Sequence, residues 1–169
     1  MNSVIYFYSK HGTTKKIVDY TKDQLQVVDV FDIKTMPENV KDFDDVLLFT
    51  PVYAGNIPRK VKVFINEHKE DLLDRNLSIF LCGANQKDEE KVIDLNFHDT
   101  IIDHANFIKY VGFGFDFDSL NFFEKLIVKV VAKQKETTED IKYELINELL
   151  KKTEVWRKKL INISNDPYQ

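Results

Sequence analysis

The chain has 169 residues, 43% of them hydrophobic, which is enough to bury one core and gives no reason to expect two. Its 24 basic and 28 acidic residues give a net charge of −4, which argues against a general nucleic-acid binder. The single cysteine excludes an internal disulfide, and the sequence shows neither a signal region nor an apolar run long enough to span a membrane. We therefore expect one cytoplasmic domain over residues 1–169.

Apolar runs alternate along the chain with segments of helical periodicity, which is typical of a parallel sheet covered on both faces by helices. Five runs rich in Val, Ile, Leu or Phe are predicted strands: 2–8, 26–31, 45–50, 77–82 and 107–113. Helices are predicted between them, from Thr14 to about Leu25, after Pro58, and from about 88–90. Pro58 suits a helix start because the first turn does not use its missing N–H.

The C-terminal part is longer than a fifth strand and helix require. Residues 120–133 form an apolar helix candidate with three lysines at four-residue intervals. This segment either packs on the sheet or on a partner subunit of a homo-oligomer, or it presents a basic amphipathic surface to a membrane or a redox partner. A last helix is predicted from near Thr137, past Trp156, to Leu160. We therefore expect an extra helical segment, inserted at about 114–136.

The first predicted strand ends in a stretch that is suited to bind phosphate. Its residues are Ser9, Lys10, His11, Gly12, Thr13 and Thr14. Such a turn leaves unpaired N–H groups at a helix N-terminus beside three hydroxyls, an arrangement that suits a phosphate monoester. The alternative is a tight turn in which Gly12 allows the bend and a threonine caps the helix. The sequence lacks both the Gly-Lys-Thr end of a nucleoside-triphosphate loop and the dinucleotide motif Gly-x-Gly-x-x-Gly.

Three of the five glycines share one kind of position. Gly12, Gly55 and Gly83 each follow the end of a predicted strand. Loops often need glycine for turn geometry alone. In an open parallel sheet, however, ligands bind in the crevice at the carboxyl ends of the strands. The pattern therefore favours a ligand site at this edge.

Three loops of this chain resemble those of the flavodoxins, which bind FMN. The pattern Ser-x-x-Gly-x-Thr is similar to their phosphate loop, and the loops after the third and fourth strands are similar to the two that border the flavin ring. The resemblance covers residues 2–113 and implies a flavodoxin-like, doubly wound α/β fold with a five-stranded parallel sheet of order 2-1-3-4-5. It implies FMN as the cofactor. The implied cofactor-binding residues are Ser9, Lys10, His11, Gly12, Thr13, Thr14, Val52, Tyr53, Ala54, Gly55, Asn56, Cys82, Gly83, Ala84 and Asn85.

The resemblance also implies roles in the ring site. Tyr53 would stack on the ring, and the Gly55 peptide would turn toward N5 when the flavin gains a proton, because glycine tolerates either orientation. The third loop has no aromatic residue for the second ring face, unlike that of many electron-carrier flavodoxins. That face is either covered by Phe113, Phe115 or Phe117, or open to a flat substrate. The open face favours an enzyme over a carrier.

A second resemblance lies in the C-terminal part. Residues 122–131, followed by 136–140, are similar to the flavodoxin-like menaquinone-dependent protoporphyrinogen oxidases, which carry an aromatic, basic-apolar segment and then a Glu-Thr-acidic stretch. This implies an FMN-dependent oxidoreductase that acts on a quinone or another flat molecule. The alternatives are a flavodoxin-type electron carrier that serves other redox enzymes, and a non-redox module that binds a phosphate ligand.

No side chain is assigned as a catalytic acid or base, because the cofactor would supply the chemistry. Cys82 is expected to be a buried residue at a strand end and not a nucleophile. The four histidines show no metal-ligand spacing, so no metal is expected.

Overall fold

The main sheet has five parallel strands in the order β2-β1-β3-β4-β5. The computed structural model describes residues 2–25, 28–35, 39–84, 86–115 and 138–153. The strands are β1 (Ser3–Phe7), β2 (Asp29–Asp32), β3 (Asp45–Pro51), β4 (Asn76–Cys82) and β5 (Ile108–Tyr110). This order confirms the predicted flavodoxin-like sheet. The strand predicted over 26–31 corresponds to β2, which starts at Asp29. Residues 26–27 lie outside the described part.

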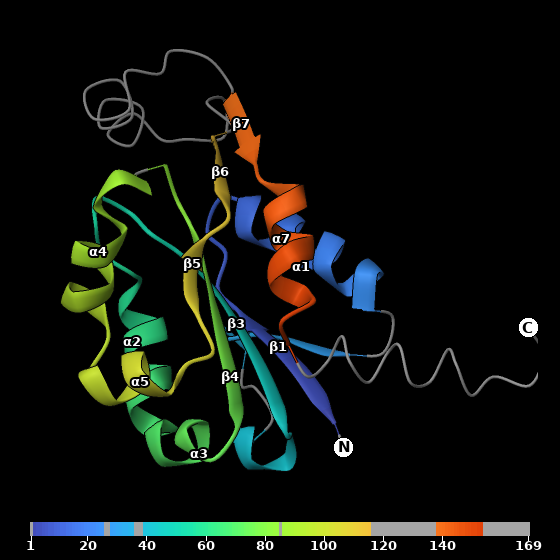
Figure 1. Cartoon of the computed structure of the whole chain (residues 1–169), viewed down its shortest axis with the longest axis vertical. Coiled ribbons are helices and arrows are strands. Elements are labelled where there is room, and N and C mark those ends of the chain that lie inside the picture. The colour runs from blue at the N-terminus through green and yellow to red at the C-terminus, as the bar shows by residue number, and fades with distance from the viewer. Residues whose placement is uncertain (1, 26–27, 36–38, 85, 116–137, 154–169) are drawn as a thin grey trace, which may run out of the picture.

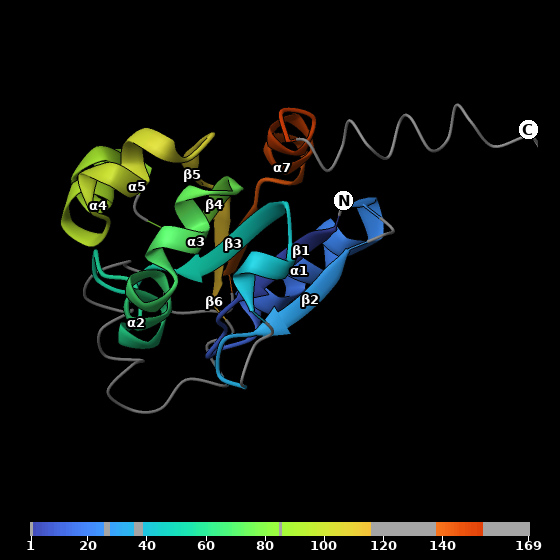
Figure 2. The ribbon, with the colours of Figure 1, turned by 90° about the horizontal axis from the view of Figure 1, so that it is seen from below.

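Helices cover both faces of the sheet (Figures 1 and 2). They are α1 (Thr13–Leu25), α2 (Arg59–Glu67), α3 (Lys69–Leu73), α4 (Glu89–Asn96), α5 (Asp99–His104) and α7 (Tyr143–Leu150), with short 3-10 turns η1 (Val40–Asp42) and η2 (Gln86–Asp88). Helices α1 and α7 pack on one face, and α2 to α5 pack on the other. The predicted helices after Pro58 and from about 88–90 are α2 and α4.

The core has two layers because side chains alternate along each strand. In β1, Val4 and Tyr6 pack toward the α2–α5 layer, whereas Ile5 and Phe7 pack toward α1 and α7. All seven residues of β3 are buried, as expected for the middle strand of a sheet covered on both faces. The rings of Phe49 in β3 and Phe80 in β4 stack with centroids 4.2 Å apart. This dense centre fixes the strand ends from which the loops emerge.

A second, two-stranded antiparallel sheet lies beyond β5. It consists of β6 (Gly112–Phe115) and β7 (Thr138–Ile141). The prediction of one strand over 107–113 was therefore wrong, since the main-sheet strand ends at Tyr110. Gly112 has φ +111°, which turns the chain out of the main sheet. Val111 N–H still donates to Leu81 O at 2.9 Å, just before this turn.

A further sequence prediction, that the last helix starts near Thr137, was wrong. Residues 138–141 form β7, because pairing with β6 satisfies their backbone groups, and the helix begins only at Tyr143. The helical insertion expected at about 114–136 stays a prediction: Gly114 and Phe115 belong to β6, and residues 116–137 lie outside the described part. The predicted helix at 120–133, and the predicted continuation of the last helix past Trp156 to Leu160, lie outside the described residues.

Candidate functional site

Three loops meet at the carboxyl edge of the main sheet. We call them the first loop (residues 8–12, after β1), the second loop (52–58, after β3) and the third loop (83–88, after β4). The His11 and Tyr53 rings bring the first two together, with centroids 5.9 Å apart and planes nearly perpendicular. Val52 N–H donates to Cys82 O at 2.8 Å and joins the second loop to the end of β4. The residues predicted from three separate parts of the sequence therefore share one edge.

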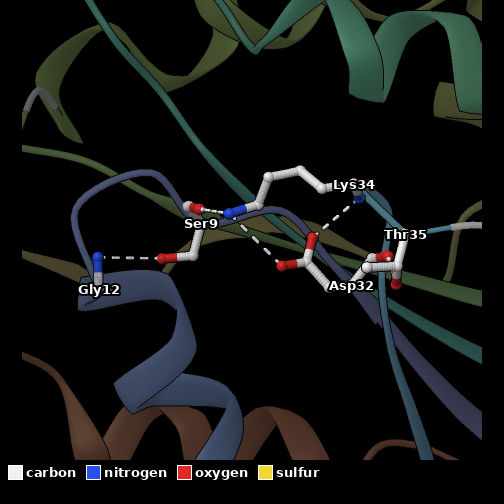
Figure 3. A network of polar contacts seen from close by, with 5 residues as sticks. All are labelled: Ser9, Gly12, Asp32, Lys34 and Thr35. Atoms are coloured by element: carbon white, nitrogen blue, oxygen red, sulfur yellow. Dashed lines mark hydrogen bonds and ion pairs between the residues drawn. The ribbon is translucent and has the colours of Figure 1, made fainter.

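The first loop presents the N-terminus of α1. Gly12 has φ +88°, and its N–H donates to Ser9 Oγ at 3.1 Å, which closes the turn (Figure 3). Lys16 N–H makes the first bond of the helix, to Gly12 O at 2.9 Å. The N–H groups of Thr13 and Thr14 precede this bond, so they have no acceptor within the helix. Together with the helix dipole, they form a site for an anion.

The three hydroxyls near this turn do not all point to the same place. Thr13 Oγ1 donates to Gly114 O in β6 at 2.8 Å. The Thr14 side chain is buried and hydrogen-bonds with the Cys82 thiol. The Ser9 hydroxyl accepts from Gly12 and keeps its own proton for another acceptor. The backbone N–H groups and Ser9 are therefore the donors best placed for an anion.

The start of α1 is also joined to the β6–β7 sheet by an ion pair. Lys16 Nζ lies 2.6 Å from Glu139 Oε2 in β7. With the bond from Thr13 to Gly114, each strand of the small sheet makes a polar contact with the start of α1. Sequence reasoning missed this connection because its partners lie more than 100 positions apart.

The second loop makes a tight turn. The backbones of Tyr53 and Asn56 exchange hydrogen bonds of 2.9 and 3.0 Å, and the two residues between them, Ala54 and Gly55, have φ +48° and +80°. Positive φ at both central positions is the geometry of a type I′ turn, which glycine adopts without strain. The Tyr53 side chain, at the start of this turn, is 38% exposed and can contact a ligand.

Asn96, the last residue of α4, holds the second loop in place. Its Nδ2 donates to Gly55 O at 2.8 Å and to Val92 O at 2.7 Å, and its Oδ1 accepts from Ile57 N at 3.0 Å. One side chain thus satisfies two backbone groups of the turn and one of the helix. Sequence reasoning missed Asn96, since nothing local to residue 96 indicates contact with residue 55.

The third loop begins with a close approach of backbone and side chains. A Cβ on Gly83 would lie 3.0 Å from Tyr110 Cε1 and 3.2 Å from Val52 Cβ. Its N–H donates to Gly112 O at 2.9 Å. Only glycine fits here without displacing a neighbour. Ala84 is exposed beside it, and the predicted Asn85 lies outside the described residues.

Comparison with protein families matches residues 4–142 to a family model described as a flavodoxin domain. The chain belongs to the flavodoxin family. This agrees with the sheet order and with the position of the three loops. Comparison with curated protein sequences finds no match.

Solved flavodoxins share the fold of this family member at low sequence identity. Oxidised flavodoxin 1 from Bacillus cereus aligns with a TM-score of 0.51 and 16% identity, over 66% of this chain and 84% of that chain. A short-chain flavodoxin associated with a PDU bacterial microcompartment aligns with a TM-score of 0.51 and 14% identity, over 65% and 82%. The Fusobacterium nucleatum flavodoxin bound to flavin mononucleotide gives a TM-score of 0.49 and 18% identity, over 73% and 77%.

The thiol of this flavodoxin-family protein is expected to be unreactive as a nucleophile. Cys82 is 5% exposed, and burial raises the pKa of its thiol to about 12, against a smaller lowering by the hydrogen bond with Thr14. Nucleophilic attack requires the thiolate. The position supports the expectation of a buried strand-end residue.

The raised pKa predicts a loss of stability at alkaline pH. At pH 8 the thiol is mostly protonated in both the folded and the unfolded protein, because its ordinary pKa is 9.0. As the pH rises from 9 toward 12, the unfolded protein releases this proton first, so the free energy of unfolding falls by on the order of 2 kcal/mol at pH 10.5. Urea unfolding at pH 8 and pH 10.5 measures the decline, which Cys82→Ala should reduce by that amount. An identical decline in the variant would contradict the prediction.

Tyr110 lies beneath the third loop with a buried hydroxyl that has no hydrogen-bond partner among the described residues. Burial, followed by the carboxylates of Glu89 and Asp88, raises the pKa of Tyr110 to about 12. An unsatisfied buried hydroxyl is costly. We therefore expect Tyr110→Phe to raise the free energy of unfolding of the ligand-free protein by about 1 kcal/mol in urea denaturation. A decrease would show that the hydroxyl is bonded.

The described residues also bear on metal binding and on membrane spanning. Within these ranges, no group of three or more His, Cys, Asp or Glu side chains could hold a metal ion. None of the helices described there is long and apolar enough to cross a membrane.

Proposed function

We propose that this protein binds FMN and acts as an FMN-dependent oxidoreductase. The observation that carries the proposal is the first loop, where Gly12 turns the chain so that the N-terminus of α1 opens beside Ser9. FMN ends in a phosphate monoester, the group that such a helix N-terminus binds. The flavodoxin family to which the chain belongs supports the same cofactor.

The second and third loops fit a flat ring next to that phosphate. Gly83 lets the start of the third loop pack closely against Val52 and Tyr110, which sets the second and third loops side by side. Tyr53 stands partly exposed at the junction of the first and second loops, where its ring can contact another ring. The residues present therefore fit FMN, with phosphate on the first loop and ring on the other two.

When bound, FMN supplies one- or two-electron transfer, and the chain supplies binding and orientation. Asn96 holds Gly55 O and Ile57 N, so the second loop would present one fixed backbone conformation to the ring. The Cys82 thiol stays protonated and takes no part.

Within this class, we favour an enzyme that reduces or oxidises a quinone or another flat molecule, like the menaquinone-dependent protoporphyrinogen oxidases that the sequence resembles. The described residues of the third loop are not aromatic, which leaves room on the second ring face. Of the phenylalanines proposed to cover it, Phe113 is half-buried in β6. The Phe115 side chain and Phe117 lie outside the described part. A cytoplasmic location, a redox partner and peripheral membrane contact through 120–133 belong to this proposal.

The test is an absorbance spectrum of the purified protein before and after addition of FMN and removal of the excess. A retained flavin band is the expected result, followed by turnover with a soluble menaquinone analogue. A flavin band without turnover would favour the electron carrier, reduced only by a protein partner. If no FMN is retained or bound, both redox functions fail.

A further inference from the structure

Lys34 reaches from the end of β2 to the first loop. Its Nζ donates to Ser9 O at 2.5 Å and lies 3.5 Å from Asp32 Oδ2 (Figure 3). The same Nζ lies 5.5 Å from the centre of the Tyr8 ring. Lys34 thus contacts two consecutive residues of the first loop, although it is 25 positions away from Ser9.

The backbone of Lys34 is fixed as well as its side chain. Its N–H donates to Asp32 Oδ1 at 2.9 Å, and both the N–H and the hydroxyl of Thr35 donate to Asp32 O at 2.9 Å. Asp32 therefore forms a turn that directs Lys34 back toward β1 (Figure 3). Both the backbone and the side chain of Lys34 therefore fix its contact with the first loop.

Ser9 is consequently held on two sides. Its carbonyl accepts from the Lys34 ammonium, and its hydroxyl accepts from Gly12 N–H. The hydroxyl is the one whose proton stays available for an anion. The Lys34 side chain is 40% exposed and its ion pair with Asp32 is long, so its charge is only partly neutralised. A hydrogen bond from a charged donor fixes geometry more strongly than a neutral one.

We propose that Lys34 is a positioning residue of the first loop, which orients Ser9 and brings a positive charge to the phosphate dianion of the ligand. This inference rests on the proposed function and adds to it a determinant of specificity. Lys34 gives the site its preference for FMN over riboflavin, which has the same ring but no phosphate.

The test compares the Kd values of FMN and riboflavin, from quenching of flavin fluorescence, for the full chain and Lys34→Met. FMN should bind about tenfold more weakly to the variant, because both the charge and the Ser9 contact are lost. Riboflavin affinity should change by less than about twofold, since only the phosphate interaction is lost. Lys34→Arg should recover part of the FMN affinity, because the guanidinium keeps the charge and a donor.

The matched control is Lys60→Met, which removes the same charge from an exposed residue of α2 near Ile33. It should leave both Kd values unchanged. Three results would overturn the proposal. FMN binding could be weakened equally by the two variants, Lys34→Met could weaken FMN and riboflavin binding equally, or Lys34→Met could leave FMN binding unchanged.

A second readout needs no ligand. Hydrogen exchange of the Gly12 amide, which is bonded to Ser9 Oγ, should be faster in Lys34→Met than in the unchanged protein, because Ser9 has lost one of its two anchors. If the unchanged protein binds no FMN, the proposed function fails, and this exchange rate still decides whether Lys34 positions the loop. An unchanged rate would overturn that role.

Discussion

Replacement of Gly112 with alanine is expected to lower the free energy of unfolding by about 3 kcal/mol. Gly112 has φ +111°, a conformation that side chains rarely adopt. A Cβ there would also overlap Asp140 O and lie 2.7 Å from Ile141 Cα. Both obstacles belong to the backbone of β7, so the strands would have to separate. Urea denaturation followed by circular dichroism measures the loss.

Gly114→Ala provides the matched control in the same strand. Its φ is not positive, and its added Cβ would meet the Thr13 side chain at 3.1 Å and not a backbone atom. A side chain can adjust by a few tenths of an ångström, so the loss should be clearly smaller than for Gly112→Ala. Equal losses would contradict the role assigned to the Gly112 conformation.

The second large effect is expected for Asn96→Ala, which should weaken FMN binding at least about tenfold and lower the free energy of unfolding by about 2 kcal/mol. The variant leaves Ile57 N–H and Gly55 O without their partner. The second loop then loses its attachment to α4, and the ring site loses its fixed shape. Fluorescence titration with FMN and urea denaturation measure the two effects.

Asn106→Ala separates these effects. Asn106 Nδ2 donates to Ser78 Oγ at 3.2 Å, in the first half of β4 and away from the three loops. This control should lower stability without changing the Kd of FMN. If Asn96→Ala alters stability alone, the second loop does not depend on Asn96 for its binding geometry.

The centre of the main sheet was predictable because β1, β3 and β4 are nearly continuous apolar runs. Such runs are typical of parallel strands buried on both faces, and β3 is buried along its whole length. The sheet order followed from the family resemblance. The error at β7 has a local cause: Thr137, Glu139 and Asp140 are favourable at a helix start, but pairing with β6 outweighs that preference. A contact between such distant segments leaves no local pattern.

The same distinction applies to the site. The glycines after β1, β3 and β4 could be predicted to lie at one edge because they follow strand ends. Asn96, Lys34 and Tyr110 were missed, because each acts on a loop that is distant in sequence. The inward direction of the Thr14 side chain and the bond from Thr13 to β6 also depend on tertiary packing. Residue types predicted where the loops lie, but only the three-dimensional structure shows which side chains fix their conformations.

The contacts of α1 with β6 and β7 make the anion site and the small sheet thermodynamically linked. A ligand that holds the first turn of α1 also holds Thr13 and Lys16 against Gly114 and Glu139, so it opposes separation of the two strands. Linkage is reciprocal, so a change that separates the two strands lowers the affinity for the ligand by the same factor by which the ligand favours their pairing. Ligand binding at the start of α1 is therefore expected to stabilise the pairing of β6 with β7.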